Sequence, residues 1–174
     1  MAGMPGSASV AKASLTPAAD TADLKSAFAC FPSGVAAVCA RLDSGPVGML
    51  VSSFTSVSLQ PALASISVME SSRTWARLRR ARRLGISFLA HDQHHVCTQF
   101  TSQPLDRFAG LDIAQTTDGA VLLPDATAWL DCSVHDEVPA GDHVIVLLRI
   151  HALHGRPAAS PLVFHGSEFH QLSA

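Results

Sequence analysis

The stretch from residue 48 to residue 68, GMLVSSFTSVSLQPALASISV, holds the side chains best suited to bind a ligand. It carries no charged residue but many small hydroxyl side chains, among them Ser52, Ser53, Thr55, Ser56, Ser58 and Ser65. An exposed loop normally carries Lys, Glu or Asp, so this composition predicts a loop whose backbone and hydroxyl donors face a flat ligand with polar edges. The alternative interpretation is a Ser-rich turn that only connects two strands.

A basic segment follows, because residues 73–83 contain six of the chain's twelve Lys and Arg residues. Ser72 can cap a helix that presents Trp75 and Leu78 on one side and arginines on another. Such arginines could contact phosphate groups. A solvated helix face that covers apolar surface with arginine stems explains the run equally well, and we favour this interpretation for most of them.

A histidine-rich segment, His91-Asp92-Gln93-His94-His95, is a further candidate site. Two imidazoles four residues apart on a helix can share a metal ion, with Asp92 in the place of the catalytic Glu of a metalloprotease. However, Asp is shorter than Glu, no third ligand stands at a fixed spacing, and His91 ends a predicted strand. We therefore expect no metal, and a zinc hydrolase is the weaker hypothesis.

The common phosphate-binding motifs do not occur in the chain. Neither a G-x-G-x-x-G after a strand nor a G-x-x-x-x-G-K-[ST] sequence is present, so a nucleotide would be held in another way. The formal net charge is -2, and Trp75 is the only aromatic residue interleaved with the arginines. We therefore expect neither nucleic acid nor a membrane as a partner.

Strand signals dominate the elements that must position these groups. Alternating or β-rich runs predict strands over residues 35–42, 47–53, 62–69, 84–91, 128–135, 144–153 and 161–165. Helices are predicted from Thr16-Pro17 to Pro32, from Ser72 onward, and over residues 92–100. A turn at residues 106–110 is expected to close a short lid. Tight turns between strands exclude a doubly wound sheet, so the prediction is a mainly β, antiparallel barrel, split or closed, with peripheral helices.

Length and composition indicate one domain with a sizeable core, since the chain has 174 residues and is 48% hydrophobic. Residues 1–15 are rich in Ala, Gly, Ser and Pro and are predicted to form a flexible tail, followed by a single domain over residues 16–174. The four cysteines (Cys30, Cys39, Cys97 and Cys132) form no C-x-x-C pair, so we expect buried free thiols. No signal sequence or membrane span is apparent, which predicts a soluble cytoplasmic protein.

Four short motifs, taken in order, resemble the flavin reductase family of the FMN-binding split barrel. They are Gly48-Met49, SFTSVSL from Ser53, SSRT from Ser71, and Gly141-Asp142-His143 before an apolar strand. The resemblance covers about residues 22–170. It implies a Greek-key split barrel, a homodimer, and an NAD(P)H-dependent flavin reductase that passes reduced FMN or FAD to a separate flavin-dependent monooxygenase.

The same resemblance implies which residues form the site. The flavin ring would lie along Met49, Leu50, Val51, Ser52, Ser53, Phe54, Thr55 and Ser56, its phosphate near Ser71, Ser72, Arg73 and Thr74, and another side of the pocket along Phe88, Leu89 and Ala90. His143 would lie beside flavin and nicotinamide and position both. The cofactors would be FAD or FMN and NADH or NADPH, which carry the hydride chemistry themselves. A non-enzymatic flavin-binding protein on the same barrel is the main alternative.

Overall fold

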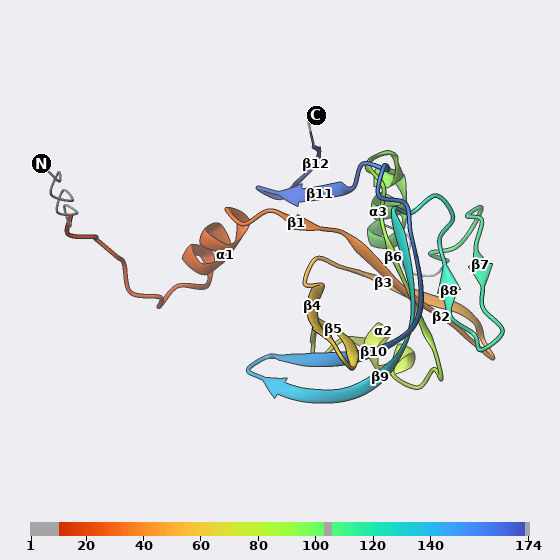
Figure 1. Ribbon diagram of the computed structural model, residues 1–174. Coiled ribbons are helices and arrows are strands. Elements are labelled where there is room, and N and C mark those ends of the chain that lie inside the picture. The colour runs from red at the N-terminus through yellow and green to blue at the C-terminus, as the bar shows by residue number, and fades with distance from the viewer. Residues whose placement is uncertain (1–10, 103–105, 173–174) are drawn as a thin grey trace, which may run out of the picture.

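The computed structural model describes residues 11–102 and 106–172 (Figure 1). Most of the predicted flexible tail, residues 1–10, lies outside the described residues, and residues 11–15 are exposed without regular secondary structure. Helix α1 (Thr21–Ala29) begins later than predicted from Thr16-Pro17, because Oδ1 of Asp20 accepts a hydrogen bond from the N–H of Ala22 at 2.7 Å and caps the helix there. No residue of α1 is buried, and the helix stands away from the body as an arm (Figure 1).

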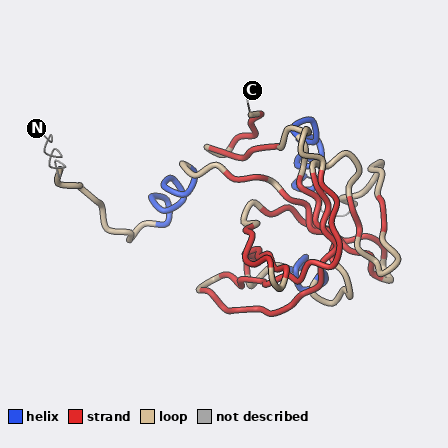
Figure 2. The backbone as a smooth tube through the Cα atoms, in the orientation of Figure 1, coloured by secondary structure: helices blue, strands red, loops and turns tan. Residues whose placement is uncertain are grey.

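Seven antiparallel strands form the main sheet, in the order β3-β2-β6-β9-β10-β5-β4. They are β2 (Ala36–Leu42), β3 (Gly45–Val51), β4 (Thr55–Leu59), β5 (Ala62–Met69), β6 (Leu84–Phe88), β9 (Ala128–Ala140) and β10 (His143–Gly155). The sheet curls around its own core (Figure 2), and its two edge strands, β3 and β4, are not paired with each other in the described part of the chain. The predicted mainly β, antiparallel split barrel with peripheral helices is confirmed.

Smaller elements surround this barrel. Strands β1 (Ser33–Gly34), β11 (Leu162–His165) and β12 (Glu168–Gln171) form a second sheet, and β7 (Ala114–Gln115) pairs with β8 (Val121–Leu122). Helix α2 (Arg73–Leu78) follows β5, and the 3-10 turn η1 (His91–Gln93) leads into α3 (His94–Ser102). The sequence did not predict β7 and β8, because two-residue strands are too short to show a period. Within the described ranges, no helix has the length and apolar character that crossing a membrane requires.

Two apolar layers pack on the two sides of β2. Inside the barrel, α2 inserts Trp75 and Leu78 into a cluster that includes Ile66 of β5. On the outer side, Phe100 of α3 belongs to a second cluster together with Ala37 of β2. Because both faces of β2 are covered, residues 36–40 are all buried and show no alternation.

Gly85 lies at the closest contact between the barrel and its outer layer. A Cβ atom at this position would overlap the carbonyl group of Val121. Two residues further along β6, Oγ of Ser87 accepts a hydrogen bond from the N–H of Leu123 at 2.9 Å. The segment at residues 121–123 is therefore held directly against the backbone of β6, which requires glycine at position 85.

The cysteines follow the prediction of buried free thiols in three of four cases. Cys39, Cys97 and Cys132 are buried, whereas Cys30, the C-cap of α1, is exposed. Burial raises the pKa of Cys97 to about 11 and that of Cys132 to about 12. Both thiols are therefore protonated and unreactive at neutral pH.

Candidate functional site

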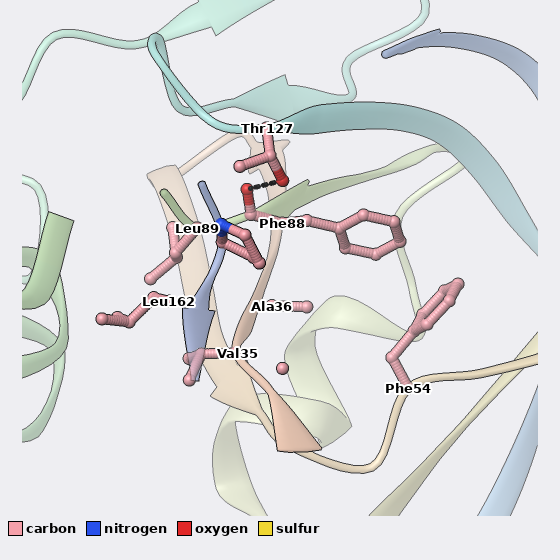
Figure 3. A pocket seen from close by; sticks show the side chains of 9 residues that line it. Val35, Ala36, Phe54, Phe88, Leu89, Thr127 and Leu162 are labelled. Carbon is pink, nitrogen blue, oxygen red and sulfur yellow. Dashed lines mark hydrogen bonds between the residues drawn. The ribbon is translucent and has the colours of Figure 1, made fainter. Parts of the chain in front are cut away.

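An apolar hollow of about 210 Å³, which we call the Phe54 hollow, opens where β2 begins and β6 ends (Figure 3). The rings of Phe54 and Phe88 meet edge to face with centroids 4.6 Å apart. Oγ1 of Thr127 donates a hydrogen bond to the carbonyl oxygen of Phe88 at 3.1 Å. The other lining residues are Gly34, Val35, Ala36, Leu89, Pro161 and Leu162. An almost wholly apolar lining with two aromatic rings suits the apolar part of an aromatic ligand.

A second hollow, of about 240 Å³, lies between β3, α2 and α3, and we call it the Arg107 hollow. It is lined by Met49, Leu50, Ser72, Thr74, Phe100, Thr101 and Arg107. Nη1 of Arg107 donates hydrogen bonds to the carbonyl oxygen of Gly48 at 2.7 Å and to Oγ1 of Thr74 at 3.2 Å. Nε of Arg107 is buried and has no hydrogen-bond partner among the described residues. A fixed guanidinium group beside the hydroxyl groups of Ser72 and Thr74 is suited to bind a phosphate.

Gly48 allows the turn at residues 106–110 to approach β3 closely. A Cβ at Gly48 would lie 2.6 Å from Sγ of Cys39 and 2.8 Å from the ring of Phe108. That ring packs edge to face against Phe100, with centroids 5.3 Å apart. The turn thereby carries Arg107 onto the carbonyl group of Gly48. Sequence reasoning predicted the turn but did not select Arg107 as a site residue, because the contact joins positions 59 residues apart.

Helix α2 begins beside the Arg107 hollow and is capped by Ser72, as the sequence predicted. Oγ of Ser72 caps it by accepting a hydrogen bond from the N–H of Trp75 at 3.1 Å, which leaves the hydroxyl proton of Ser72 free to donate to a ligand. Nε1 of Trp75 donates to Oε1 of Glu137 at 3.0 Å, and Arg79 pairs with the same carboxylate. These contacts fix the helix against β9, while Ser71 and Arg73 are exposed at its start.

The Ser/Thr-rich stretch is only partly the loop that the sequence predicted. Residues 55–59 form the edge strand β4, so Thr55 and Ser56 are exposed on a strand. Before it, Oγ of Ser53 donates to the carbonyl oxygen of Ser67 at 2.8 Å and accepts from the N–H of the same residue at 3.0 Å. The Ser53 side chain therefore takes the place of a strand partner beside β5. The hydroxyl group that we expected to bind a ligand is occupied within the protein.

Replacing Ser53 by alanine is expected to lower the free energy of unfolding by about 1–2 kcal/mol, because two half-buried backbone groups of Ser67 lose their partner. Chemical denaturation of the variant measures this loss. Ser52→Ala is the matched control, since Ser52 is exposed, and it should change stability by less than about 0.5 kcal/mol. Equal stability of the two variants would show that the Ser53 bonds contribute nothing.

His143 stands at the first position of β10, directly after the predicted Gly-Asp turn. Its Nδ1 lies 2.7 Å from Oδ1 of Asp142. Because a carboxylate only accepts, Nδ1 carries a proton and Nε2 is left for a ligand. The hydrogen bond from His143 lowers the pKa of the Asp142 carboxyl group below its ordinary value. The carbonyl oxygen of Asp142 accepts from the N–H of Glu70 at 3.1 Å, so this turn adjoins the turn that carries Ser71.

The histidine-rich segment is divided between two elements, with His91 in η1 and His95 in α3. Nδ1 of His95 lies 3.2 Å from the carbonyl oxygen of Asp92. In the part of the chain that the structure describes, no group of three or more His, Cys, Asp or Glu side chains is arranged to hold a metal ion. The structure thus offers no support for the zinc hydrolase hypothesis.

Residues 28–173 match the model of the flavin reductase like domain. The chain is 37% identical over 134 residues to the reductase subunit of stachydrine N-demethylase from Rhizobium meliloti, covering 76% of this chain and 58% of that protein. It is 31% identical over 139 residues to the reductase subunit of a flavin-dependent monooxygenase from Rhodococcus jostii, covering 80% of this chain and 71% of that protein. The first of these relatives is therefore considerably longer than the matched region.

Among solved structures, the NADH:FAD oxidoreductase of Streptomyces globisporus superposes with a TM-score of 0.86 at 31% identity, covering 94% of this chain and all of that one. The same oxidoreductase has also been solved in complex with NAD and FAD fragments. The chain belongs to the flavin reductase family. The resemblance on which the sequence analysis relied is thereby confirmed over nearly the whole chain.

The residues that the flavin reductase resemblance selected fall into separate groups. Met49, Leu50, Ser72 and Thr74 line the Arg107 hollow, whereas Phe54, Phe88 and Leu89 line the Phe54 hollow. Val51 and Ala90 are buried in the core. Ser52, Thr55, Ser56, Ser71 and Arg73 are exposed and line neither hollow, and Ser53 is tied to β5. His143 lines neither hollow. It lies opposite Met69 of β5, and its turn adjoins Glu70, shortly before the residues of α2 that line the Arg107 hollow.

Proposed function

We propose that this member of the flavin reductase family is an NAD(P)H:flavin oxidoreductase that supplies reduced FMN or FAD to a separate monooxygenase. The observation that carries the proposal is the Arg107 hollow, where a fixed guanidinium group and two hydroxyl groups meet beside the edge strand β3. Family membership and the names of the relatives support the same activity. We infer that the reduced flavin is passed to a partner enzyme because two of the relatives are named reductase subunits.

The residues present fit a flavin nucleotide. Ser72, Thr74 and Arg107 offer the donors that a phosphate requires. The free edge of β3 at Leu50, whose backbone groups point the same way as the carbonyl oxygen of Gly48, offers partners to the polar edge of a ring. Bound flavin and nicotinamide supply the hydride transfer between them. The chain's contribution is to bind both molecules, to orient them and to exclude water.

Purified protein mixed with each flavin and each nicotinamide tests this function, with oxidation of the nicotinamide followed by its absorbance. We expect turnover with a large excess of free flavin over protein. If the protein binds flavin but does not oxidise the nicotinamide, it is a flavin-binding protein without enzymatic activity. The same matrix of substrates identifies which of FMN, FAD, NADH and NADPH the protein uses.

His143 is proposed to orient the reactants, since Asp142 fixes its ring and leaves Nε2 available. His143→Ala should lower turnover with nicotinamide by about tenfold to a hundredfold, or about 1.4–2.7 kcal/mol of barrier, because the side chain positions and does not carry the hydride. Flavin affinity, measured by fluorescence quenching, should change less than kcat/KM for NADH. A variant with the wild-type kcat/KM for both nicotinamides removes His143 from the site.

A homodimer is proposed as the working assembly. Ile145 of β10 and Val138 of β9 are exposed directly opposite each other, and Met69 is exposed on the neighbouring strand β5. Phe28 and Phe31 are exposed at the end of the α1 arm. Apolar side chains gathered on one sheet face and on a projecting helix are typical of a surface that a second copy covers.

Sedimentation at micromolar concentration is expected to show a dimer. Ile145→Glu should shift the protein toward monomer because it places a charge in the apolar face, while Ile145→Val should remain dimeric. A wild-type monomer that still reduces flavin at this concentration would overturn the proposal without affecting the assigned activity.

A further inference from the structure

Two more hollows continue from the Arg107 hollow along α2. The first of them, of about 340 Å³, shares the lining residues Thr74 and Arg107 with the Arg107 hollow. The second, of about 460 Å³, shares Ser44 and Arg77 with the first. Each hollow therefore borders the next through the side chains that they share. We call the two outer hollows the arginine groove, which runs from Thr74 to Arg82.

The arginine groove concentrates positive charge in a chain whose formal net charge is -2. Five arginines line it against two acids, and these residues are Arg41, Arg77, Arg80, Arg82 and Arg107 with Asp43 and Asp106. Arg82 pairs with Asp118 at 3.4 Å. Within the described residues, Arg41, Arg77 and Arg80 form no ion pair, so their charges remain available to an anion.

The arginines of the basic segment make different contacts, although most of them are exposed, as expected for a solvated face. Arg79 pairs with Glu137, and Arg83 lies 3.7 Å from Asp131, so these two arginines hold α2 and its C-terminal end to the sheet. Arg77 and Arg80 instead face the groove, where Nη2 of Arg77 donates to Oγ of Ser44 at 3.1 Å. Unlike Arg79 and Arg83, these two arginines form no ion pair with an acidic side chain among the described residues.

We propose that the arginine groove binds the adenosine monophosphate half of FAD, so that the protein prefers FAD to FMN. The inference rests on the proposed function, in which Ser72, Thr74 and Arg107 hold the flavin phosphate. FAD extends FMN at that phosphate, and the groove begins at Thr74, where the extension would emerge. Helix α2 rises about 6 Å from Thr74 to Leu78, and Arg80 and Arg82 lie beyond its C-terminal end, further along the groove.

The chemistry of the groove matches each part of that extension. Guanidinium groups of Arg77 and Arg80 present paired N–H donors to the second phosphate. Leu42 and Ala81 provide apolar surface for the adenine, and Arg41 can stack on its face. FMN would leave all of these groups unused.

The test compares the dissociation constants of FAD, FMN and riboflavin for the wild type and for the double variant R41Q/R80Q. Both arginines are exposed, so the substitutions leave the core unchanged. The wild type should bind FAD about tenfold more tightly than FMN. In the double variant, the affinity for FAD should fall about tenfold, whereas the affinity for FMN should stay within about twofold of the wild-type value. Raising the salt concentration should weaken FAD binding more steeply than FMN binding in the wild type only.

R156Q removes one exposed arginine that pairs with Asp125 away from the groove, and it should leave both affinities unchanged. If the wild type binds neither flavin, the proposed function itself fails. If FAD and FMN bind equally and the double variant weakens neither, the function stands and the groove assignment is wrong. The double variant could instead show a raised KM for NADH, with FMN as the flavin, and an unchanged affinity for FAD. That result would assign the groove to the nicotinamide dinucleotide and would also overturn the proposal.

Discussion

Gly85→Ala is expected to lower the free energy of unfolding by about 3–5 kcal/mol, a large part of the stability of a domain of this size. The added Cβ would overlap the backbone carbonyl group of Val121, which cannot rotate away as the end of a flexible side chain could. Relief requires the segment at residues 121–123 to move off β6, which breaks the bond between Leu123 and Ser87 and opens the outer apolar layer.

Denaturant unfolding of purified variants measures the effect, with Gly155→Ala as the matched control. Gly155 is also a strand residue, the last one of β10, but a Cβ atom there would have no other atom within 4 Å. The control should therefore stay within about 0.5 kcal/mol of the wild type. If Gly85→Ala is as stable as Gly155→Ala, the close contact between β6 and Val121 does not exist in solution.

Arg107→Met is expected to weaken the binding of both FMN and FAD by about a hundredfold, or about 2.7 kcal/mol, because the flavin phosphate would lose its charged partner. The variant keeps the length of the side chain but removes the donors that reach the carbonyl group of Gly48 and Oγ1 of Thr74. Arg107→Lys should recover part of the affinity, since it restores the charge without the planar fork.

Riboflavin, which has no phosphate, distinguishes binding from structural damage in this experiment. Its affinity should stay nearly constant across the Arg107 variants if the guanidinium group contacts the phosphate. An equal loss for riboflavin and FMN would mean that Arg107 acts by holding the turn at residues 106–110 against β3. That result would leave the Arg107 hollow without its phosphate assignment.

Sequence reasoning succeeded where one residue pattern determined the local structure. Strand β5 has its predicted bounds, residues 62–69, because Ala64, Ile66 and Val68 alternate with partly exposed residues and Pro61 precedes them. The cap at Ser72 was also predicted, since the hydroxyl group precedes the apolar face of Trp75. The Ser72 cap depends on residues that are close in sequence, and the strand β5 depends on an alternating pattern that faces one core.

The failures share a different physical cause. Strand β4 has no buried residue and forms because β5 offers it a hydrogen-bonding edge, which its hydroxyl-rich sequence does not reveal. The start of α1 was predicted at Thr16-Pro17, but the side chain of Asp20 forms the cap. Arg107 was missed because its partners, Gly48 and Thr74, are brought to it only by the closed fold.

The exposure of Cys30 makes the protein suitable for site-specific labelling without mutation. The other three thiols are buried, so a maleimide dye added to native protein should react at the end of α1 alone. The dye would then sit on the arm that projects from the barrel, next to Phe28 and Phe31. In the proposed dimer, energy transfer between two labelled subunits would report the distance between the two arms with and without flavin.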